Sequence, residues 1–491
     1  MAVSRAPPAK RARFELDSAR AALERLPEGL MEGSMDEFLS GGEGGGEGDD
    51  PVACRAAYVR HVLARAGAPP AAARDARGLF LAVEAATRGQ AACDLWWLLR
   101  RSLATASSVR WGAAGPRPLV RLGRGPAAEE RDTAATAFGR DNEPLARALV
   151  RACCVPPGDL PTPDGLEGGG GRADELGPVF VFDAAAGAAG AAAAAAAEEH
   201  TCGLLIDPRT GALGASIDML VCDRDARGEL APHPTQTSLG VFEIKCRAKY
   251  AFDPDDGGAT ARAHAALLAS RSAAALRAFL RSVRRPGVEH CPPDGCPGAA
   301  EALASCAEAW AAPPPAGAGA PAPARRCSEF DRRHLALNRG VTSRVWLFNE
   351  PAADSGAIGL AAWDTGETAL EAPLFANPRH ANFKQILVQS YVLAGYFPER
   401  AAAPHLVTFI GRRRRAREQG PLAVRAGPGA EACAVPREGA VPVLLIATPV
   451  AVDGELAREA LERPAREAFR AALGESWDRR RRAAGAAATA S

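Results

Sequence analysis

Apolar residues follow two different spacings along this chain, and the change between them separates a helical part from a part that contains strands. From Val52 to about Cys154 they recur three and four positions apart, as in YVRHVLARAG, GLFLAVEAAT and CDLWWLLRRSL. This is the pattern of amphipathic helices. From Cys202 to Lys245 they form short apolar runs, CGLLI, ALGASIDMLVC and LGVFEIK, separated by turn-forming residues. These runs predict two or three strands with at least one hairpin.

The second half of the chain alternates helical and strand-like segments. Helical spacing predicts one long helix over 259–285, another over 380–393 and a closing helix over 455–473. The runs RVWLF, HLVTFI and VPVLLIATPV predict strands. Helices mixed with strands in this order favour a central mixed sheet flanked by helices, so the predicted fold class is α/β.

Low-complexity segments interrupt this pattern and suggest seven parts. We expect a mobile N-terminal arm at 1–50, a helical N-terminal lobe at 51–154, a low-complexity insertion at 155–200, the first part of the core at 201–285, a Pro/Ala/Gly-rich loop at 286–325, the second part of the core at 326–477 and a basic, Ala-rich tail at 478–491. Tracts such as GGEGGGEGDD bury too little apolar surface to offset the entropy lost on ordering.

Composition narrows the class of protein. The chain has 491 residues, 47% of them hydrophobic, and a formal net charge of +1. No uncharged apolar run reaches the roughly 18 residues that cross a bilayer, and no apolar segment follows the basic start as in a secretory signal. The 12 cysteines lack framework spacing, so we expect free thiols, an intracellular location and no contact with membranes.

Lysine is rare in this chain, which makes each lysine informative. Only Lys10, Lys245, Lys249 and Lys384 occur, whereas arginine is abundant. A lysine within an apolar segment therefore suggests a function that arginine does not serve. The basic run 412–415 follows a predicted strand; it suits contact with a nucleic-acid backbone, a nuclear import signal or a solvated charged turn.

One group of residues predicts chemistry. Glu243 and Lys245 are two apart in the strand-like run FEIK, so their side chains leave the same face of a sheet. If the segment that ends at Asp218 pairs with this strand, the two carboxylates lie only about 5 Å apart. Two such carboxylates suit a hard cation such as Mg²⁺. The alternative is an exposed strand with a structural Glu–Lys ion pair, which the apolar neighbours Phe242 and Ile244 disfavour.

Longer motifs resemble a known family. The runs GLLIDPRTGALGASIDMLVC, FEIKCRAKYAF and ANFKQILVQSYVLAGYF are similar to those of the herpesvirus alkaline nucleases, including the shutoff exonucleases of gammaherpesviruses. The resemblance extends from about Arg55 to Trp477. It implies the PD-(D/E)xK restriction-endonuclease-like fold and a Mg²⁺-dependent deoxyribonuclease, a 5′→3′ exonuclease with endonuclease activity, with messenger RNA cleavage in the gammaherpesvirus branch.

The resemblance also implies roles for particular residues. Asp218 and Glu243 match the metal-binding pair and Lys245 the catalytic lysine, while Glu143 matches an acidic residue supplied from a helix to the same one or two ions. Mn²⁺ is expected to substitute for Mg²⁺. Arg247, on the same strand face as Lys245, suits bidentate contact with a phosphate. A solvated glutamate at the start of a helix and an edge arginine are the simpler readings of Glu143 and Arg247.

Seven further residues are candidates for substrate binding. Ser216 precedes Asp218 by two and leaves room for a phosphate. Two other segments supply polar donors. One is 88–112, which the resemblance places around the 5′ end of the substrate, and the other is the predicted helix over 380–393. The set is Ser216, Gln90, Arg100, Ser107, Ser108, Gln385 and Gln389. Arginine on an amphipathic helix and an amide pair on a helix surface also occur without function, and Trp96 and Trp97 are expected in the core.

The expected partners are DNA and also RNA, with a viral single-stranded DNA-binding or annealing protein as a further one, in the host nucleus and cytoplasm. Two alternatives stay open. In the first, the same site acts mainly as an RNA endonuclease in host shutoff. In the second, the protein is a non-catalytic nucleic-acid-binding scaffold.

Overall fold

The structure is a computed structural model of the whole chain. It describes residues 23, 25–26, 30, 34–40, 50–68, 74–112, 115–122, 133–154, 202–221, 223–224, 230–231, 238–283, 288–290, 309–311, 328–426 and 432–490. Within them the helices are α3 (Met35–Ser40), α4 (Pro51–Arg65), α5 (Ala76–Ala86), α6 (Asp94–Arg100), α7 (Ala134–Cys154), α8 (Ala259–Ser270), α9 (Ala273–Ser282), α10 (Glu329–Asn338), α11 (Ala381–Tyr396) and α12 (Gly454–Ala490), with 3₁₀ turns η1 (Gln90–Ala92), η3 (Ala248–Tyr250) and η5 (Ala416–Glu418).

Nine strands of the described residues join one mixed sheet. Its order is β17, β16, β13, β12, β18, β15, β9, β6, with β14 paired to β12. The strands are β6 (Met219–Val221), β9 (Ser238–Cys246), β12 (Ser343–Phe348), β13 (Ala357–Ala361), β14 (Ala369–Ala372), β15 (Ala401–Arg412), β16 (Leu422–Arg425), β17 (Cys433–Val435) and β18 (Val441–Pro449). The expected α/β class with a central mixed sheet is confirmed.

Smaller sheets surround it. One contains β1 (Ala104–Thr105), β5 (Leu213–Ala215) and β4 (Leu205–Ile206), of which β4 and β5 are antiparallel. The pairs are β2 (Arg110–Gly112) with β3 (Gly115–Arg117), β7 (Asp223–Arg224) with β8 (Leu230–Ala231), and β10 (Val288–His290) with β11 (Ala309–Ala311). The β4–β5 pair is the hairpin predicted after residue 202.

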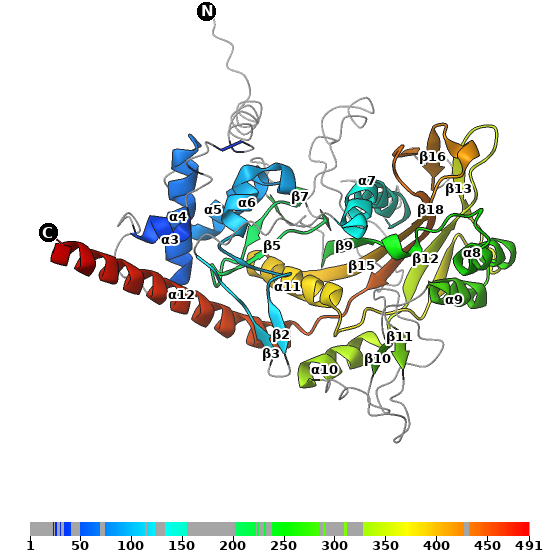
Figure 1. Cartoon of the computed structure of the whole chain (residues 1–491). Helices are drawn as coiled ribbons and strands as arrows, with labels where there is room; N and C mark the ends of the chain where they lie inside the picture. Colours follow the sequence, from blue (N-terminus) through cyan, green and yellow to red (C-terminus); the bar gives the residue numbers. More distant parts are fainter. Residues whose placement is uncertain are drawn as a thin grey trace, which may run out of the picture.

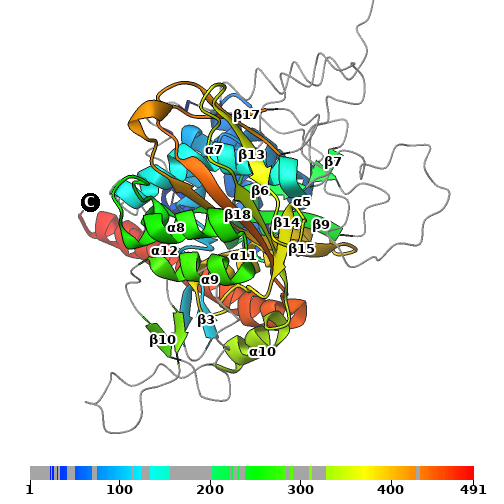
Figure 2. The same ribbon diagram turned by 90° about the vertical axis from the view of Figure 1, so that its right-hand side faces the viewer.

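Alternation along β9 sends neighbouring side chains to different helices. Phe242 and Ile244 pack in a cluster with Leu145 and Leu149 of α7. Val241 points the other way and packs in the cluster that contains α11. Figures 1 and 2 show α7 on one face of the sheet, and α11 with α8 and α9 on the other. Because it shares the face of Val241, Glu243 lies towards α11.

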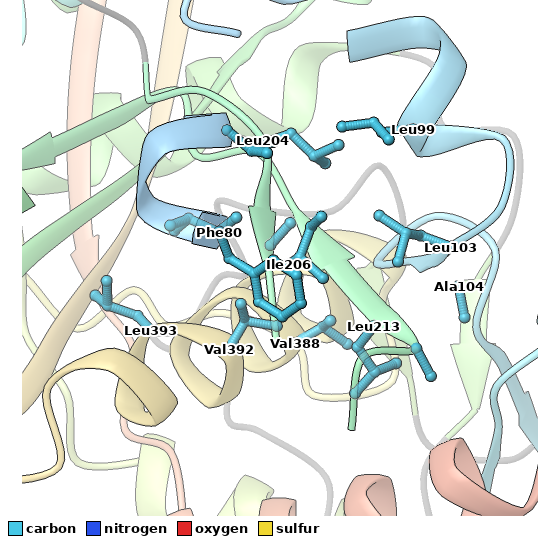
Figure 3. Packing of buried hydrophobic residues seen from close by; sticks show 14 of the residues in the cluster. Phe80, Leu99, Leu103, Ala104, Leu204, Ile206, Leu213, Val388, Val392 and Leu393 are labelled. Atoms are coloured by element: carbon cyan, nitrogen blue, oxygen red, sulfur yellow. The ribbon is translucent and has the colours of Figure 1, made fainter. Parts of the chain in front are cut away.

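Helix α11 is buried on nearly all sides, including the polar side chains of Lys384 and Gln389. Figure 3 shows its Val388 and Val392 among Phe80 of α5, Ile206 of β4 and Leu213 of β5. The N-terminal helices therefore share one hydrophobic core with α11 and α12. Within the helical N-terminal lobe expected at 51–154, α4 to α6 belong to this core and α7 packs on the sheet.

Other expected boundaries also need correction. Met35 and Phe38, in the arm expected to be mobile, are buried in the core, and Asp36 bonds Ser476 of α12. The expected tail 478–491 continues α12 as helix to Ala490. The tract 41–49 and the insertion 155–200 lie outside the described residues, as does most of 286–325.

The single helix expected over 259–285 is two helices. Arg271 ends α8 in the left-handed region with φ 49°, and the Ser272 hydroxyl caps α9 by accepting from Ala275 N at 3.3 Å. Serine is a favoured N-cap, so a new helix starts there although the apolar spacing continues. The prediction of one continuous helix over 259–285 is therefore wrong.

Two expectations from composition, on membrane-spanning segments and on cysteines, can be compared with the described residues. Of the helices in the described ranges, none combines the length and the apolar character needed to span a membrane. The seven cysteines within those ranges are all free thiols.

Candidate active site

Asp218 and Glu243 face each other across two antiparallel strands. Met219 of β6 pairs with Phe242 of β9, so the same register places Asp218, one residue before β6, opposite Glu243. The Asp218 carboxylate also accepts a hydrogen bond from the backbone N–H of Ile244 at 2.8 Å. The pairing on which the sequence argument depended is thus present, with both acids at the same point of the sheet.

Glu243 is completely buried and bonded on both oxygens. Its Oε1 accepts from the Lys245 ammonium group, and its Oε2 accepts from Gln389 Nε2 at 2.6 Å. Gln389 also donates to the backbone carbonyl of Ser216 at 2.9 Å. The Gln389 amide of α11 therefore connects β9 with the segment that leads to Asp218. Gln389 was expected to contact substrate, and the structure instead gives it these two protein partners.

The electrostatics of this group are those of a buried acid with a second acid beside it. Burial raises the pKa of Glu243, and the neighbouring Asp218 raises it further, to about 7, against the opposing effects of Lys245 and Gln389. Burial disfavours the charged form of Lys245, but Glu243 and Asp218 outweigh it and raise the pKa of the lysine. The site thus carries negative charge that one ammonium group only partly balances.

Glu143 approaches from α7 but is engaged elsewhere. Its carboxylate forms an ion pair with Arg147, one turn along the helix, at 2.6 Å. Burial raises its pKa, as does the charge of Asp218, which places the two acids in one electrostatic environment. In the described part of the chain no three His, Cys, Asp or Glu side chains are gathered so as to hold a metal ion. The role of Glu143 as a third metal-binding carboxylate therefore stays a prediction.

Trp96 connects this site to the residues expected around the substrate's 5′ end. Its indole N–H donates to the Ser216 hydroxyl at 2.8 Å, and the Arg100 guanidinium lies over its ring at 4.5 Å. Arg100 in turn donates to the Ser107 hydroxyl at 3.4 Å. Trp96 is buried, as predicted for a core residue. The hydrogen bond from its indole N–H to Ser216 was not predicted, because no sequence pattern shows which acceptor an indole N–H contacts.

The remaining candidates have local roles in the structure. Gln90 donates to the backbone carbonyl of Cys202 at 2.9 Å from a left-handed backbone with φ 44°. Ser108 closes a turn with Thr105, whose N–H it accepts at 2.7 Å. Gln385 is half-buried on α11. These contacts leave the expected substrate roles as proposals.

Arg247 directly follows β9. It precedes η3, and its backbone N–H donates to the carbonyl of Phe409 at 3.0 Å. Its side chain is half-buried. Together with Lys249 and Lys245 it lowers the pKa of His380, at the start of α11, to about 4 after the larger effect of burial. Positive charge therefore gathers beside the two acids.

The basic run 412–415 is not a free basic patch. Arg412 is buried and bonds Glu418 at 2.7 and 2.8 Å and Glu350 at 2.6 Å. Arg415 bonds the same Glu350 and Asp255. Arg414 donates to four backbone carbonyls. Three of the four arginines are thus engaged within the protein, which disfavours this run as an import signal or a nucleic-acid contact.

The donor set fits the divalent cation that the resemblance implies. Asp218 and Glu243 supply two hard oxygen ligands at one point of the sheet. Gln389 Oε1 is buried and has no hydrogen-bond partner among the described residues, so the amide next to Glu243 keeps an unused acceptor. A cation between the acids would remove the repulsion that raises the pKa of Glu243. The residues present therefore suit Mg²⁺ or Mn²⁺.

Comparisons with known proteins identify the family of this chain. The family model of viral alkaline exonucleases matches residues 41–488. The chain is 46% identical to the alkaline nuclease of equine herpesvirus 1 (strain Ab4p) over 415 residues, which are 83% of this chain and 70% of that protein. It is 42% identical to the alkaline nuclease of varicella-zoster virus (strain Dumas) over 417 residues, 82% of this chain and 74% of that protein.

Solved structures share the fold. The SOX RNA complex of KSHV superposes with a TM-score of 0.61 at 19% identity, covering 93% of this chain and 96% of that one. A SOX–DNA complex gives a TM-score of 0.56 at 19% identity, covering 94% and 91%. At this identity the likeness concerns the fold alone. The family match over most of the chain, together with relatives at 42% and 46% identity, shows that this chain belongs to the viral alkaline exonuclease family and is a nuclease.

Proposed function

We propose that this nuclease is a Mg²⁺-dependent deoxyribonuclease, a 5′→3′ exonuclease with endonuclease activity that processes viral DNA. One observation carries the proposal. Two carboxylates, Asp218 and Glu243, oppose each other beside the ammonium group of Lys245 at the end of a buried strand. This is the arrangement of a PD-(D/E)xK core, to which we assign the fold.

Each residue has a separate task in this mechanism. Asp218 and Glu243 would hold the ion, and Glu143 would add a third carboxylate once a cation offsets the repulsion. When bound, the ion would stabilise the negative charge that develops on the scissile phosphate and lower the pKa of water. Lys245 donates to the attacking water or to a phosphate oxygen, since its ammonium group lies on the same strand face as Glu243. Gln389 keeps Glu243 in place.

The residues on either side would bind the substrate. Arg247 lies two positions beyond Lys245, and a guanidinium matches phosphate oxygens bidentately. Ser216 and Arg100 are connected through Trp96, so donors extend continuously from the acids to Ser107. We assign this second group, with Ser108, Gln90 and Gln385, to the nucleotides near the 5′ end.

The test is cleavage of end-labelled duplex DNA with Mg²⁺, Mn²⁺, Ca²⁺ or a chelator, beside the variants Asp218→Asn and Lys245→Ala. We expect Mg²⁺- and Mn²⁺-dependent product, none with the chelator, and loss of at least 10²-fold in rate for Lys245→Ala with DNA binding retained. Near-normal cleavage by Lys245→Ala would remove its catalytic assignment. Equal cleavage with the chelator would overturn the metal dependence.

RNA is the second candidate substrate. The chain is 27% identical to the shutoff alkaline exonuclease of Epstein-Barr virus over 225 residues, 43% of this chain and 44% of that protein, and solved neighbours are complexes with DNA and with RNA. Phosphodiester cleavage at this site does not require a 2′-hydroxyl. Rates on an unstructured RNA, a stem-loop RNA and a 5′-phosphorylated duplex DNA, measured side by side, rank the substrates. The family assignment weighs against the non-catalytic scaffold.

Location and partners follow from the proposed substrate. We propose action in the host nucleus, where viral DNA would be processed, and in the cytoplasm if RNA is cleaved. A viral single-stranded DNA-binding or annealing protein would receive the strand that a 5′→3′ exonuclease exposes. Imaging of the tagged chain in infected cells and co-purification with and without nuclease treatment test both points.

A further inference from the structure

Lys384 is a buried lysine that the proposed chemistry does not use. Its side chain is buried, with 5% exposed. The ammonium group bonds Asp331 and lies over two aromatic rings, 4.6 Å from the centroid of Trp111 and 4.5 Å from that of Phe330. The two rings are themselves 5.4 Å apart. A buried ammonium group costs free energy unless it is paired, and here one anion and two ring faces surround it.

These four residues join three segments that are far apart in sequence. Trp111 belongs to the β2–β3 hairpin, Phe330 and Asp331 begin α10, and Lys384 lies in the first turns of α11. Figure 1 shows the hairpin and α10 on the same side of the molecule, below α11. We call this group, Trp111, Phe330, Asp331 and Lys384, the Lys384 latch.

Two residues of the Lys384 latch, Trp111 and Lys384, lie close in sequence to residues of the proposed site. Trp111 is three residues after Ser108, so it anchors the chain directly beyond the segment assigned to the 5′ end. Lys384 is five residues before Gln389, which bonds Glu243. The latch therefore connects the donor segment Arg100–Ser108 to the helix that holds the buried carboxylate.

We propose that Lys384 is a positioning residue that fixes the Arg100–Ser108 segment relative to the cleavage site, and so sets how tightly the enzyme holds a phosphorylated 5′ end. The inference rests on the proposed function. Lys384 touches neither acid, so releasing the latch loosens the hairpin and the segment before it. The bonds that Gln389 makes to Glu243 and Ser216 stay in place, so substrate affinity changes and the rate of the bound complex does not.

The test compares Lys384→Met, which keeps the chain length and removes the charge, with Lys384→Arg, which keeps a cation over the rings. The probes are a duplex DNA with a 5′-phosphate and the same duplex with a 5′-hydroxyl. Affinity is measured in Ca²⁺, and the single-turnover rate at saturation in Mg²⁺. We expect Lys384→Met to raise Kd about 5- to 20-fold for the phosphorylated duplex, with a smaller change for the hydroxyl duplex and a saturated rate within about 2-fold of the unsubstituted enzyme. Lys384→Arg should keep most of the affinity of the unsubstituted enzyme, because a cation still lies over the two rings.

Two further variants separate positioning from general loosening. Trp111→Leu should weaken binding like Lys384→Met, and the double variant should be no weaker than the poorer single variant, because both changes open the same latch. Arg344→Met is the matched control. It removes an Arg344–Trp346 cation–π contact at 5.2 Å in β12, outside the latch, and should leave Kd unchanged.

Several results would overturn the inference. They are an unchanged Kd in Lys384→Met, equal weakening for both 5′ ends, additive single effects, or a saturated rate that falls as far as the affinity. If Lys384→Met does not fold, Trp111→Leu and Lys384→Arg still give the Kd comparison. If the unsubstituted enzyme cleaves no duplex, the proposed function is refuted. If it cleaves duplex DNA and Lys384→Met has an unchanged Kd, this inference alone is refuted.

Discussion

Gln389 and Glu243, 146 positions apart in the chain, share a buried hydrogen bond of 2.6 Å. The amide donates to the carboxylate and through the same nitrogen to the Ser216 carbonyl. Partners of this kind orient a metal-binding carboxylate, and their loss usually costs 10- to 100-fold in metal affinity or activity.

We therefore expect Gln389→Leu to lower the saturated cleavage rate by about 10- to 100-fold and to raise the Mg²⁺ concentration at half-maximal rate. The reason is that Glu243 Oε2 loses its donor inside the protein and no longer has a fixed position. A Mg²⁺ titration of single-turnover cleavage measures both quantities. Gln419→Leu, which changes an exposed amide near η5, is the control. A normal rate and titration in Gln389→Leu would show that the bond does not orient Glu243.

The raised pKa of Glu243 predicts how metal-free stability depends on pH. In the folded protein its pKa is about 7, and its ordinary value is 4.5. The folded state thus holds the proton more tightly, so its contribution to stability is present at low pH and is lost as pH rises from about 4.5 to 7. The loss is on the order of 1 to 3 kcal/mol.

The variant Glu243→Gln should remove this loss. In chelator at pH 8 we expect it to unfold at a higher denaturant concentration than the unsubstituted chain, and to lose the stabilisation that Mg²⁺ gives to the unsubstituted chain. Denaturant titrations at pH 5 and pH 8, with and without Mg²⁺, provide the comparison. Equal stability of the two proteins at pH 8 without metal would show that ionisation of Glu243 does not destabilise the folded protein.

The network around Arg412 predicts the opposite dependence on pH. Burial would raise the pKa of Glu418, but hydrogen bonds from Arg412 and from the Arg415 backbone outweigh it and lower the pKa to about 2. The stability that Glu418 contributes is therefore complete above about pH 4.5 and is lost as pH falls towards 2.

Glu418→Gln should destabilise the fold by about 3 kcal/mol at pH 7, because it leaves a buried guanidinium short of one anion. The difference from the unsubstituted chain should shrink as pH falls from 4.5. Urea unfolding at pH 7 and at pH 3.5 measures it, with Glu459→Gln on the exposed face of α12 as control. A difference that is constant over this range would refute the role of the ionised carboxylate.

Two glycines predict opposite effects of the same substitution. A Cβ on Gly203 would lie 1.9 Å from the backbone oxygen of Glu84, whereas a Cβ on Gly139, inside α7, meets nothing within 4 Å. Gly203→Ala should thus prevent normal folding or cost more than about 3 kcal/mol. Gly139→Ala should stabilise by about 0.5 to 1 kcal/mol, since alanine favours helix. Thermal unfolding of both variants decides, and a tolerated Gly203→Ala would argue against the close approach of that loop to α5.

Arg247 predicts a change in salt dependence. If its side chain neutralises one phosphate of duplex DNA, Arg247→Gln lowers the slope of log affinity against log salt by about 0.9. Binding is measured in Ca²⁺ over a range of salt, with the exposed Arg437→Gln as control. An unchanged slope would leave Arg247 without a phosphate contact.

The sequence by itself determined the elements that depend on local patterns. Apolar spacing located α5, α11, β9, β15 and β18 within a few residues, because helix and strand periods are written directly in neighbouring positions. It also placed Glu243 and Lys245 on one strand face, since alternation needs no tertiary information. The apolar segment that ends at Asp218 suggested this residue as their partner, and the resemblance of the longer motifs implied the same residue.

Only the tertiary structure decided which distant groups meet. The pairing of Gln389 with Glu243, the bond from Trp96 to Ser216 and the burial of Lys384 between two rings each depend on how three or more segments pack. The basic run at 412–415 was ambiguous for the same reason, since its anions at Glu350 and Glu418 become partners only when the ends of the sheet are in place. Local spacing specifies the direction of a side chain from its own strand or helix, whereas its partner is specified by the packing of the whole core.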